Sequence, residues 1–117
     1  MRYSVKGTNL VVTDQLSDYL DKKFSAIVKL LDHFGPAVNI WVEVEQTTRH
    51  HRTGEIFRAE FQVQIARKRI VAQATGGNIF EAVDQARDVL LHELRVYKEK
   101  LENKSQRQGR RWKERSQ

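Results

Sequence analysis

The C-terminal segment of the chain contains the side chains best suited to bind nucleic acid. Residues 103–117 hold six lysines and arginines against a single acidic residue, Glu114. Trp112 stands among the arginines, so the segment could pair phosphates through its cations and stack a base on its indole ring. The alternative is a segment that only keeps the protein soluble, but an exposed Trp is unfavourable for that role. We therefore predict RNA contacts from Arg107, Arg110, Arg111, Trp112 and Lys113.

Three lysines nearer the N-terminus are further candidates for phosphate contacts. Lys22 and Lys29 have a spacing that puts both on the outward side of a helix, where lysines are commonly just solvated. Lys23 has the helical phase of the apolar side, where a cation is unfavourable. Either its alkyl chain lies along the edge of the core with the ammonium in water, or it projects into a groove between two helices and meets phosphate.

A second basic group falls on the flank and outside of a helix predicted at residues 78–101. Cations in such positions suit contacts with the nucleic-acid backbone and do not read base edges. We predict that this group, with the three lysines above, binds RNA phosphates. Its members are Arg87, Arg95 and Lys98.

Two basic turns are ambiguous. His50 and His51 lie in the sequence RHHRTG, and adjacent residues of a strand point to opposite faces, so they would chelate a metal poorly. An RNA contact shared with the flanking arginines is one alternative, and an ordinary exposed hairpin is another. The Arg-Lys-Arg turn at residues 67–69 has the same two interpretations.

No set of side chains suggests catalysis or a cofactor. Glu43, Glu45 and Glu60 could form an acidic group on one face of a sheet, but no nucleophile or phosphate-binding loop accompanies them. We interpret them as a solvated surface. The chain contains no cysteine, which rules out disulfides, thiol nucleophiles and cysteine-bound metals. We therefore predict a protein that is not an enzyme and has no metal, no cofactor and no small-molecule substrate.

Four strands are predicted from alternating apolar residues. Tyr3 and Val5 define the first strand, which ends at Gly7. The second and third are long antiparallel strands at residues 38–45 and 57–65, on either side of the RHHRTG turn. The turn ARKR leads to a fourth strand at about residues 70–74, which the sequence GGN ends.

Two amphipathic helices position the candidate cations. Thr13 caps the first helix, Asp14 lies at its positive end, and Gly35-Pro36 stops it. Asn78, with Glu81 three residues later, resembles a capping box that starts the second helix. The apolar stripes are Leu16, Leu20, Phe24, Ile27 and Leu31 in the first, and Ile79, Val83, Ala86, Leu90, Leu94, Tyr97 and Leu101 in the second.

The predicted order is βαβββα, an α+β fold in one domain over residues 1–102. A right-handed crossover through the first helix makes the first two strands parallel and the other pairs antiparallel. The result is a four-stranded mixed sheet with both helices on one face, similar to a double-stranded-RNA-binding module. Residues 103–117 lack aliphatic anchors, and we predict a disordered basic tail.

The charge of the 117-residue chain is concentrated in this tail. Net charge is +6, and most of it comes from residues 103–117, which suits a phosphate backbone or an anionic membrane surface. No apolar run approaches the roughly 18 residues needed to span a bilayer. The N-terminus MRYSVKG lacks the apolar stretch of a signal peptide. We predict a soluble, cytoplasmic protein with no membrane partner.

Two stretches, in this order, carry a family resemblance. The first runs from Gly7 to Phe24 and contains Thr-Asp and Lys-Lys; the second runs from Asn78 to Lys98. Over about residues 1–101 the chain resembles the bacterial ribosome hibernation-promoting factors, the group that includes ribosome-associated inhibitor A and is also called the sigma-54 modulation protein family, in a short form. The matching residues are Gly7, Thr13, Asp14, Leu16, Tyr19, Lys22, Lys23, Ala82, Val83, Asp84, Ala86, Asp88, Leu90, Leu94, Arg95, Tyr97 and Lys98.

The resemblance implies a ribosome hibernation factor of the stress response and stationary phase. Such a translation inhibitor binds the small ribosomal subunit and its ribosomal RNA. It would dock in the decoding channel between head and body and exclude tRNA and mRNA sterically. Off the ribosome we expect a monomer.

The chain also departs from the family pattern. Family members often have further basic residues where this chain has Val89, His92 and Val96, which weakens the match in the second helix. Some members continue into a second domain that pairs ribosomes, and we expect no pairing through such a domain here. The alternative from the residues alone is a general RNA-binding or RNA-chaperone module without ribosome specificity.

Overall fold

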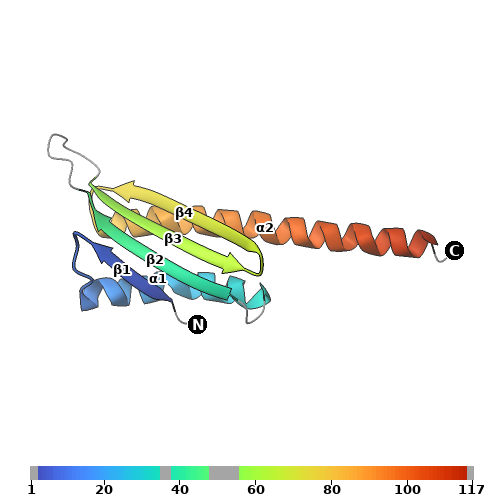
Figure 1. Ribbon diagram of the computed structural model, residues 1–117, viewed down its shortest axis with the longest axis horizontal. Coiled ribbons are helices and arrows are strands. Elements are labelled where there is room, and N and C mark those ends of the chain that lie inside the picture. The colour runs from blue at the N-terminus through green and yellow to red at the C-terminus, as the bar shows by residue number, and fades with distance from the viewer. Residues whose placement is uncertain (1–2, 35–37, 48–55, 116–117) are drawn as a thin grey trace.

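A four-stranded sheet forms one layer of the protein. The computed structural model describes residues 3–34, 38–47 and 56–115, with no side chains described for His33 and residues 104–115. The strands β1 (Ser4–Thr8), β2 (Val38–Gln46), β3 (Phe57–Ile65) and β4 (Lys68–Gly76) lie in the order β1-β2-β3-β4. β1 pairs in parallel with β2, and the other pairs are antiparallel (Figure 1). The predicted mixed sheet is confirmed.

Both helices lie on one face of this sheet (Figure 1). They are α1 (Asp14–Leu31), which a short 3-10 helix at Asp32–Phe34 extends, and α2 (Ile79–Arg115). The side chain of Thr13 caps α1 as predicted, accepting the N–H of Leu16 at 3.2 Å. Asn78 accepts the N–H of Glu81 at 2.9 Å, and the Glu81 carboxylate accepts the N–H of Gly77 at 3.3 Å.

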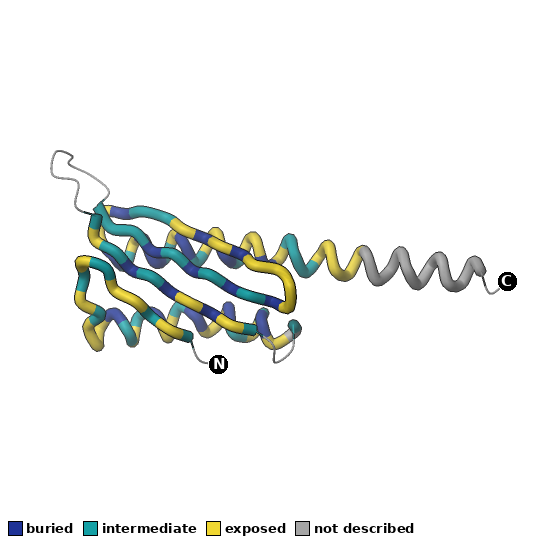
Figure 2. Tube along the Cα trace, viewed as in Figure 1, coloured by how far each residue is buried: buried dark blue, intermediate teal, exposed yellow. Residues whose placement is uncertain are grey.

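The core lies between the sheet and the helices. Residues along β2 and β3 alternate between buried and more exposed, which is visible as alternating colours in Figure 2. Phe24 of α1 stacks on Tyr3 at 4.6 Å between ring centroids and meets the ring of Phe61 edge-on at 5.0 Å. The buried residues of both helices include every member of the predicted stripes except Tyr97, which is partly buried, and Leu101.

Gly7 has a steric role at the end of β1. A Cβ atom at this position would lie 2.3 Å from the carbonyl oxygen of Leu10, closer than any real Cβ approaches an oxygen. The backbone turns back over Gly7 before α1 begins, and Asn9 in this turn has a positive φ of 55°. Any side chain at position 7 would therefore force the entry to α1 to move.

The hairpin between β3 and β4 is tighter than the sequence suggests. Ile65 pairs with Lys68, so only Ala66 and Arg67 form the turn, and β4 is longer than the predicted residues 70–74. Ala66 has a φ of 52°, a conformation that a side chain makes unfavourable. Pairing along the full length of β3 holds the turn in place, because each added ladder bond stabilises the register.

The end of α2 differs from the sequence prediction. Among the described side chains the last fully buried one is Leu94, Tyr97 stacks on Phe34 at 5.5 Å, and Leu101 is 41% exposed. The prediction that Leu101 belongs to the core is wrong because the helix has passed the end of the sheet there (Figure 2). The backbone stays helical to Arg115, where the sequence predicted disorder. Residues 99–107 are mostly good helix formers that extend an existing helix, so no new nucleation is needed. The domain boundary at residue 102 stays a prediction.

Candidate nucleic-acid interface

Lys23 lies between the two helices. Its ammonium nitrogen is 3.4 Å from a carboxylate oxygen of Asp84 on α2 and 5.2 Å from the centre of the Tyr19 ring. The Tyr19 hydroxyl donates to the same carboxylate at 2.6 Å. Of the two predicted placements, Lys23 takes the one that faces the neighbouring helix, but there it meets a carboxylate. Its charge is therefore shared before any ligand arrives.

Tyr19 acts as a fixed donor to Asp84. Burial raises the pKa of Tyr19 to about 12, and the hydrogen bond to Asp84 and the charge of that carboxylate act in the same direction. Arg87 opposes the shift through its positive charge. The phenol therefore stays protonated at neutral pH and joins α1 to α2.

Arg87 is only partly satisfied. One guanidinium nitrogen is 3.2 Å from Asp88, and its Nε is buried with no partner among the described residues. An unpaired buried donor costs free energy, typically about 1–3 kcal/mol. This N–H is therefore a buried donor left without an acceptor among the described residues.

Three other cations among the described side chains of the helices point outward. Lys22, Lys29 and Arg95 are exposed and form no ion pair with any described carboxylate. Lys98 lies 4.0 Å from Glu102, one turn further along α2. The predicted outward placement of Lys22 and Lys29 is confirmed, and their role in RNA binding stays a prediction.

The helical face is not uniformly basic. α1 carries three aspartates and three lysines, so its formal charge is zero. Residues 107–113, which include the predicted Arg107, Arg110, Arg111, Trp112 and Lys113, have a helical backbone, and their side chains lie outside the described part of the chain. His50 and His51 lie outside the described residues altogether. The charge of α1 as a whole therefore gives no attraction for RNA, and any contact must come from individual cations.

The open face of the sheet carries an ion-pair cluster that the sequence prediction missed. Arg58 bonds to Glu43 at 2.5 Å and to Glu45 at 2.8 Å, and lies 3.6 Å from Glu60. The interpretation of these three glutamates as a merely solvated surface is therefore incomplete. The alternation of residues along β3 could have predicted that Arg58 lies on the same face as the glutamates. Only the register of β2 and β3 places it opposite Glu45.

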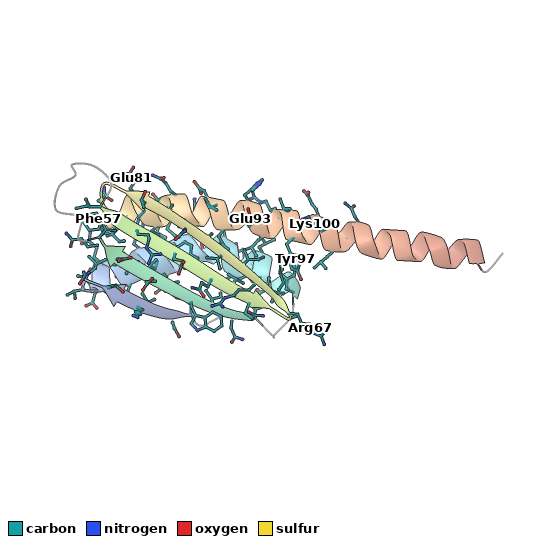
Figure 3. All side chains as sticks on the ribbon, turned by 45° about the horizontal axis from the view of Figure 1, so that its top comes forward. Phe57, Arg67, Glu81, Glu93, Tyr97 and Lys100 are labelled. Carbon is teal, nitrogen blue, oxygen red and sulfur yellow. The ribbon has the colours of Figure 1, made fainter. Side chains whose placement is uncertain are left out.

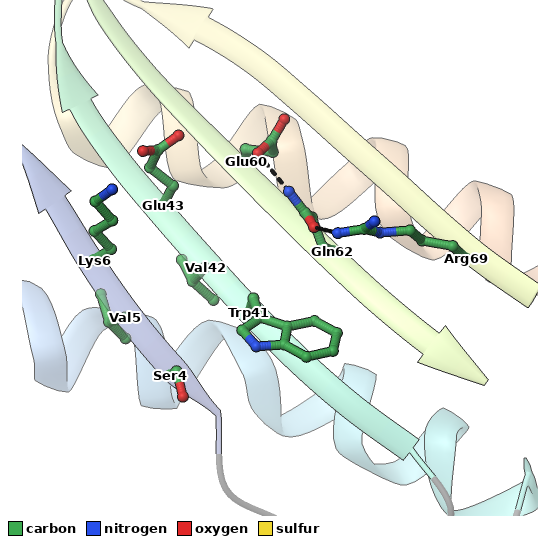
Figure 4. A pocket seen from close by; sticks show the side chains of 9 residues that line it. All are labelled: Ser4, Val5, Lys6, Trp41, Val42, Glu43, Glu60, Gln62 and Arg69. Carbon is green, nitrogen blue, oxygen red and sulfur yellow. Dashed lines mark hydrogen bonds between the residues drawn. The ribbon is translucent and has the colours of Figure 1, made fainter. Parts of the chain in front are cut away.

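Beside this cluster the open face has a hollow of about 310 Å³ (Figure 4). Trp41 forms one wall and is 43% exposed. Across it, Arg69 donates to Gln62, and Gln62 donates to Glu60 at 2.9 Å. The cations here are balanced by carboxylates, so this face has no excess charge for a phosphate backbone. The RNA contacts predicted for the helix residues stay predictions.

Arg58→Gln should destabilise the fold in a pH-dependent way. The hydrogen bond from Arg58 holds the pKa of Glu43 below its ordinary value, so this stabilisation is present above about pH 4.5 and is lost as the pH falls through the folded pKa. We expect a loss of about 1–2 kcal/mol at neutral pH. Urea unfolding near neutral pH and in acid measures it.

Arg69→Gln is the matched control for this change, because Arg69 lies on the same face and bonds to the neutral Gln62. It should change the free energy of unfolding by much less. A loss for Arg58→Gln that is equal in acid and at neutral pH would contradict the assignment to Glu43.

No metal site or membrane span is found in the described part of the chain. Among residues 3–34, 38–47 and 56–103, no three histidine, aspartate or glutamate side chains are placed to hold a metal ion. No helix within the described ranges is long and apolar enough to cross a bilayer.

Solved structures with this fold are known. The N-terminal domain of Protein Y from Thermus thermophilus superposes with a TM-score of 0.64 at 23% identity, covering 81% of this chain and 96% of that domain. A ribosomal subunit interface protein from Coxiella burnetii gives a TM-score of 0.57 at 19% identity, covering 81% of this chain and 97% of the other. These similarities confirm the fold.

Sequence comparison identifies the family. A protein named ribosome hibernation promotion factor from a Picosynechococcus species is 28% identical over 86% of this chain and 50% of its own length. Its namesake from Deinococcus radiodurans is 27% identical over 92% of this chain and 54% of its own. The chain thus spans about half the length of these curated relatives. A family model described as sigma 54 modulation protein / S30EA ribosomal protein matches residues 3–102. This chain belongs to that family, as the two sequence motifs predicted.

Proposed function

We propose that this protein is a cytoplasmic ribosome hibernation factor that binds the small ribosomal subunit and represses translation. The family match over residues 3–102 carries the proposal, and the names of the relatives support it. The chain would act as a binding protein without catalysis. Activities that reside in the other half of the longer relatives are not part of the proposal.

The mechanism we infer is steric exclusion. Outward lysines and arginines of the helices and the C-terminal segment would pair with ribosomal RNA phosphates, an interaction that needs no base readout. A rigid domain held in the decoding channel would then occupy the space of tRNA and mRNA, and initiation would stop.

Co-sedimentation tests the proposal directly. The purified protein should sediment with small subunits and idle ribosomes, and should not sediment with large subunits alone. Cell-free translation should fall as the protein is added. Equal binding to large subunits would favour a general RNA-binding module, an alternative that the basic C-terminal segment supports. Full translation at saturating protein would contradict steric exclusion.

Neutralising Lys22 and Lys29 together should weaken binding to small subunits about tenfold near 0.1 M salt, because a protein that pairs with fewer phosphates releases fewer counterions. We choose these lysines because both are exposed and neither pairs with a described carboxylate. Lys23 is left in place, since its removal would leave Asp84 without its cation. Binding can be measured by sedimentation across a range of salt concentrations.

The matched control removes the same charge from the opposite side of the domain. Lys6→Gln with Asn39→Asp changes the net charge equally, and both residues are exposed on strands β1 and β2. If this control weakens binding as much as Lys22→Gln with Lys29→Gln, the helix residues make no specific contact.

A further inference from the structure

The turn between β3 and β4 lies where α2 passes the end of the sheet. Figure 3 labels Arg67 at this end of the sheet, where Tyr97 of α2 is also labelled, and Figure 1 shows the β3–β4 turn at the end past which α2 continues. Arg67 and Lys68 are exposed, and the ladder from Ile65 to Phe57 holds them on a rigid hairpin. The turn therefore lies at the same end of the sheet as the stretch of α2 that leaves the domain.

The two helices are parallel, and their charges are sorted in the same way along their length. α1 runs opposite to β2 and α2 runs opposite to β4, so their later turns share one end of the molecule (Figure 1). Contacts between Tyr19 and Asp84 near the start and between Phe34 and Tyr97 near the end confirm this direction. In the first turns acidic residues predominate, with Arg87 as the exception, and these are Asp14, Asp18, Asp21, Glu81, Asp84 and Asp88; Asp32, Glu93, Glu99 and Glu102 lie further along.

The opposite end collects the cations, and we call it the basic end. It consists of the residues that we call the turn cations, which are Arg67 in the turn with Lys68 and Arg69 at the start of β4, and of Lys29, Arg95, Lys98 and Lys100. The helix that carries the basic residues of the C-terminal segment leaves the sheet at this same end.

Few of these cations are neutralised within the protein. Glu93, Glu99 and Glu102 lie on the same stretch of α2. Of these three, only Glu102 forms an ion pair with a described cation, at 4.0 Å from Lys98. Arg67 and Lys68 have no ion pair with any described carboxylate. The backbone of the hairpin is already ordered, so only the side chains of these cations lose conformational freedom when they bind an anion. Such a surface suits a run of phosphates.

We propose that the basic end is an RNA phosphate-binding surface in which the turn cations Arg67, Lys68 and Arg69 take part beside α2. The ligand class is the backbone of structured RNA, bound without base readout. The proposal rests on the proposed function for its biological ligand, ribosomal RNA, and it adds a hairpin to the helix residues predicted from the sequence. The basic end would lead the domain onto RNA.

Neutralising the turn tests this directly. Arg67→Gln with Lys68→Gln should weaken binding about tenfold near 0.1 M salt and reduce the slope of log affinity against log salt by roughly 0.7 to 0.9 for every phosphate that is no longer paired. The control, Gln15→Glu with Gln46→Glu, makes the same change in net charge at exposed positions of the opposite end. It should leave affinity nearly unchanged. Circular dichroism and thermal unfolding should show that both variants keep the parent fold.

Two probes separate this proposal from the proposed function. Purified small subunits are tested by sedimentation, and a blunt-ended RNA duplex is tested by fluorescence anisotropy. Binding to both probes that is weakened by the turn variant and not by the control supports the basic end. A parent protein that binds the duplex through the turn but not small subunits would overturn the proposed function alone.

Other outcomes would overturn the basic end. If the turn variant and the control bind both probes with equal affinity, the basic end is not the RNA-binding surface, although the proposed ribosome binding stands. A parent that binds neither probe would overturn both proposals. Phosphatidylserine vesicles are a third probe, and binding to them that depends on the turn while RNA binding does not would assign the surface to membranes instead.

Discussion

Deleting residues 103–117 is expected to weaken binding to small ribosomal subunits about a hundredfold near 0.1 M salt. The segment contains six lysines and arginines and one glutamate, and α2 delivers it from the basic end of the domain. Each phosphate that the truncated protein no longer pairs should reduce the slope of log affinity against log salt by roughly 0.7 to 0.9. A salt titration of the parent and the truncated protein against small subunits measures both quantities.

The truncation should leave the domain folded, because every buried residue of the core described in the structure lies at or before Leu94. Thermal unfolding of the truncated protein provides this control. Trp112→Ala in the full chain separates stacking from charge: it should cost on the order of 1–3 kcal/mol of binding if the indole stacks on a base, with little change in the slope. Identical slopes for parent and truncation would reduce the segment to a solubilising appendage.

Phe24→Ala should lower the free energy of unfolding by about 3–5 kcal/mol, the largest stability effect we expect. Phe24 is 2% exposed and contacts the rings of Tyr3 and Phe61, so its removal leaves a cavity between α1 and the sheet. Phe61 belongs to β3 and Tyr3 directly precedes β1, so neither ring can easily move into the space. Equilibrium unfolding in urea gives the difference.

The control for this prediction is Val71→Ala, which also shortens an apolar side chain of the sheet. Val71 is 48% exposed. The substitution should change stability by only a few tenths of a kcal/mol, since surface substitutions are usually within about 0.5 kcal/mol. If Phe24→Ala costs no more than the control, α1 is not anchored through this ring.

Local patterns were enough to predict the fold. Alternation along β2 and β3 assigns Val42 and Phe61 to the buried face, because successive side chains of a strand point to opposite sides. The stripe of α1 and the cap at Thr13 follow from helical periodicity and from the unpaired N–H groups of a first turn. The two motifs that identified the family also lie in these local segments.

The arrangement of charges required the tertiary structure. Arg58 meets three glutamates, and Lys23 meets Asp84, only because strand register and helix packing bring together residues far apart in the sequence. Leu101 has the phase of a core residue, but the sheet ends before it.

The same distinction explains the basic end. Composition identified the lysines and arginines as candidates for phosphate binding, since that depends only on their chemistry. Their collection at one end follows from two parallel helices and a two-residue turn between β3 and β4. Periodicity determines which side of its own element a residue occupies. The distance between residues of different elements is set by how those elements pack, and no local pattern encodes it.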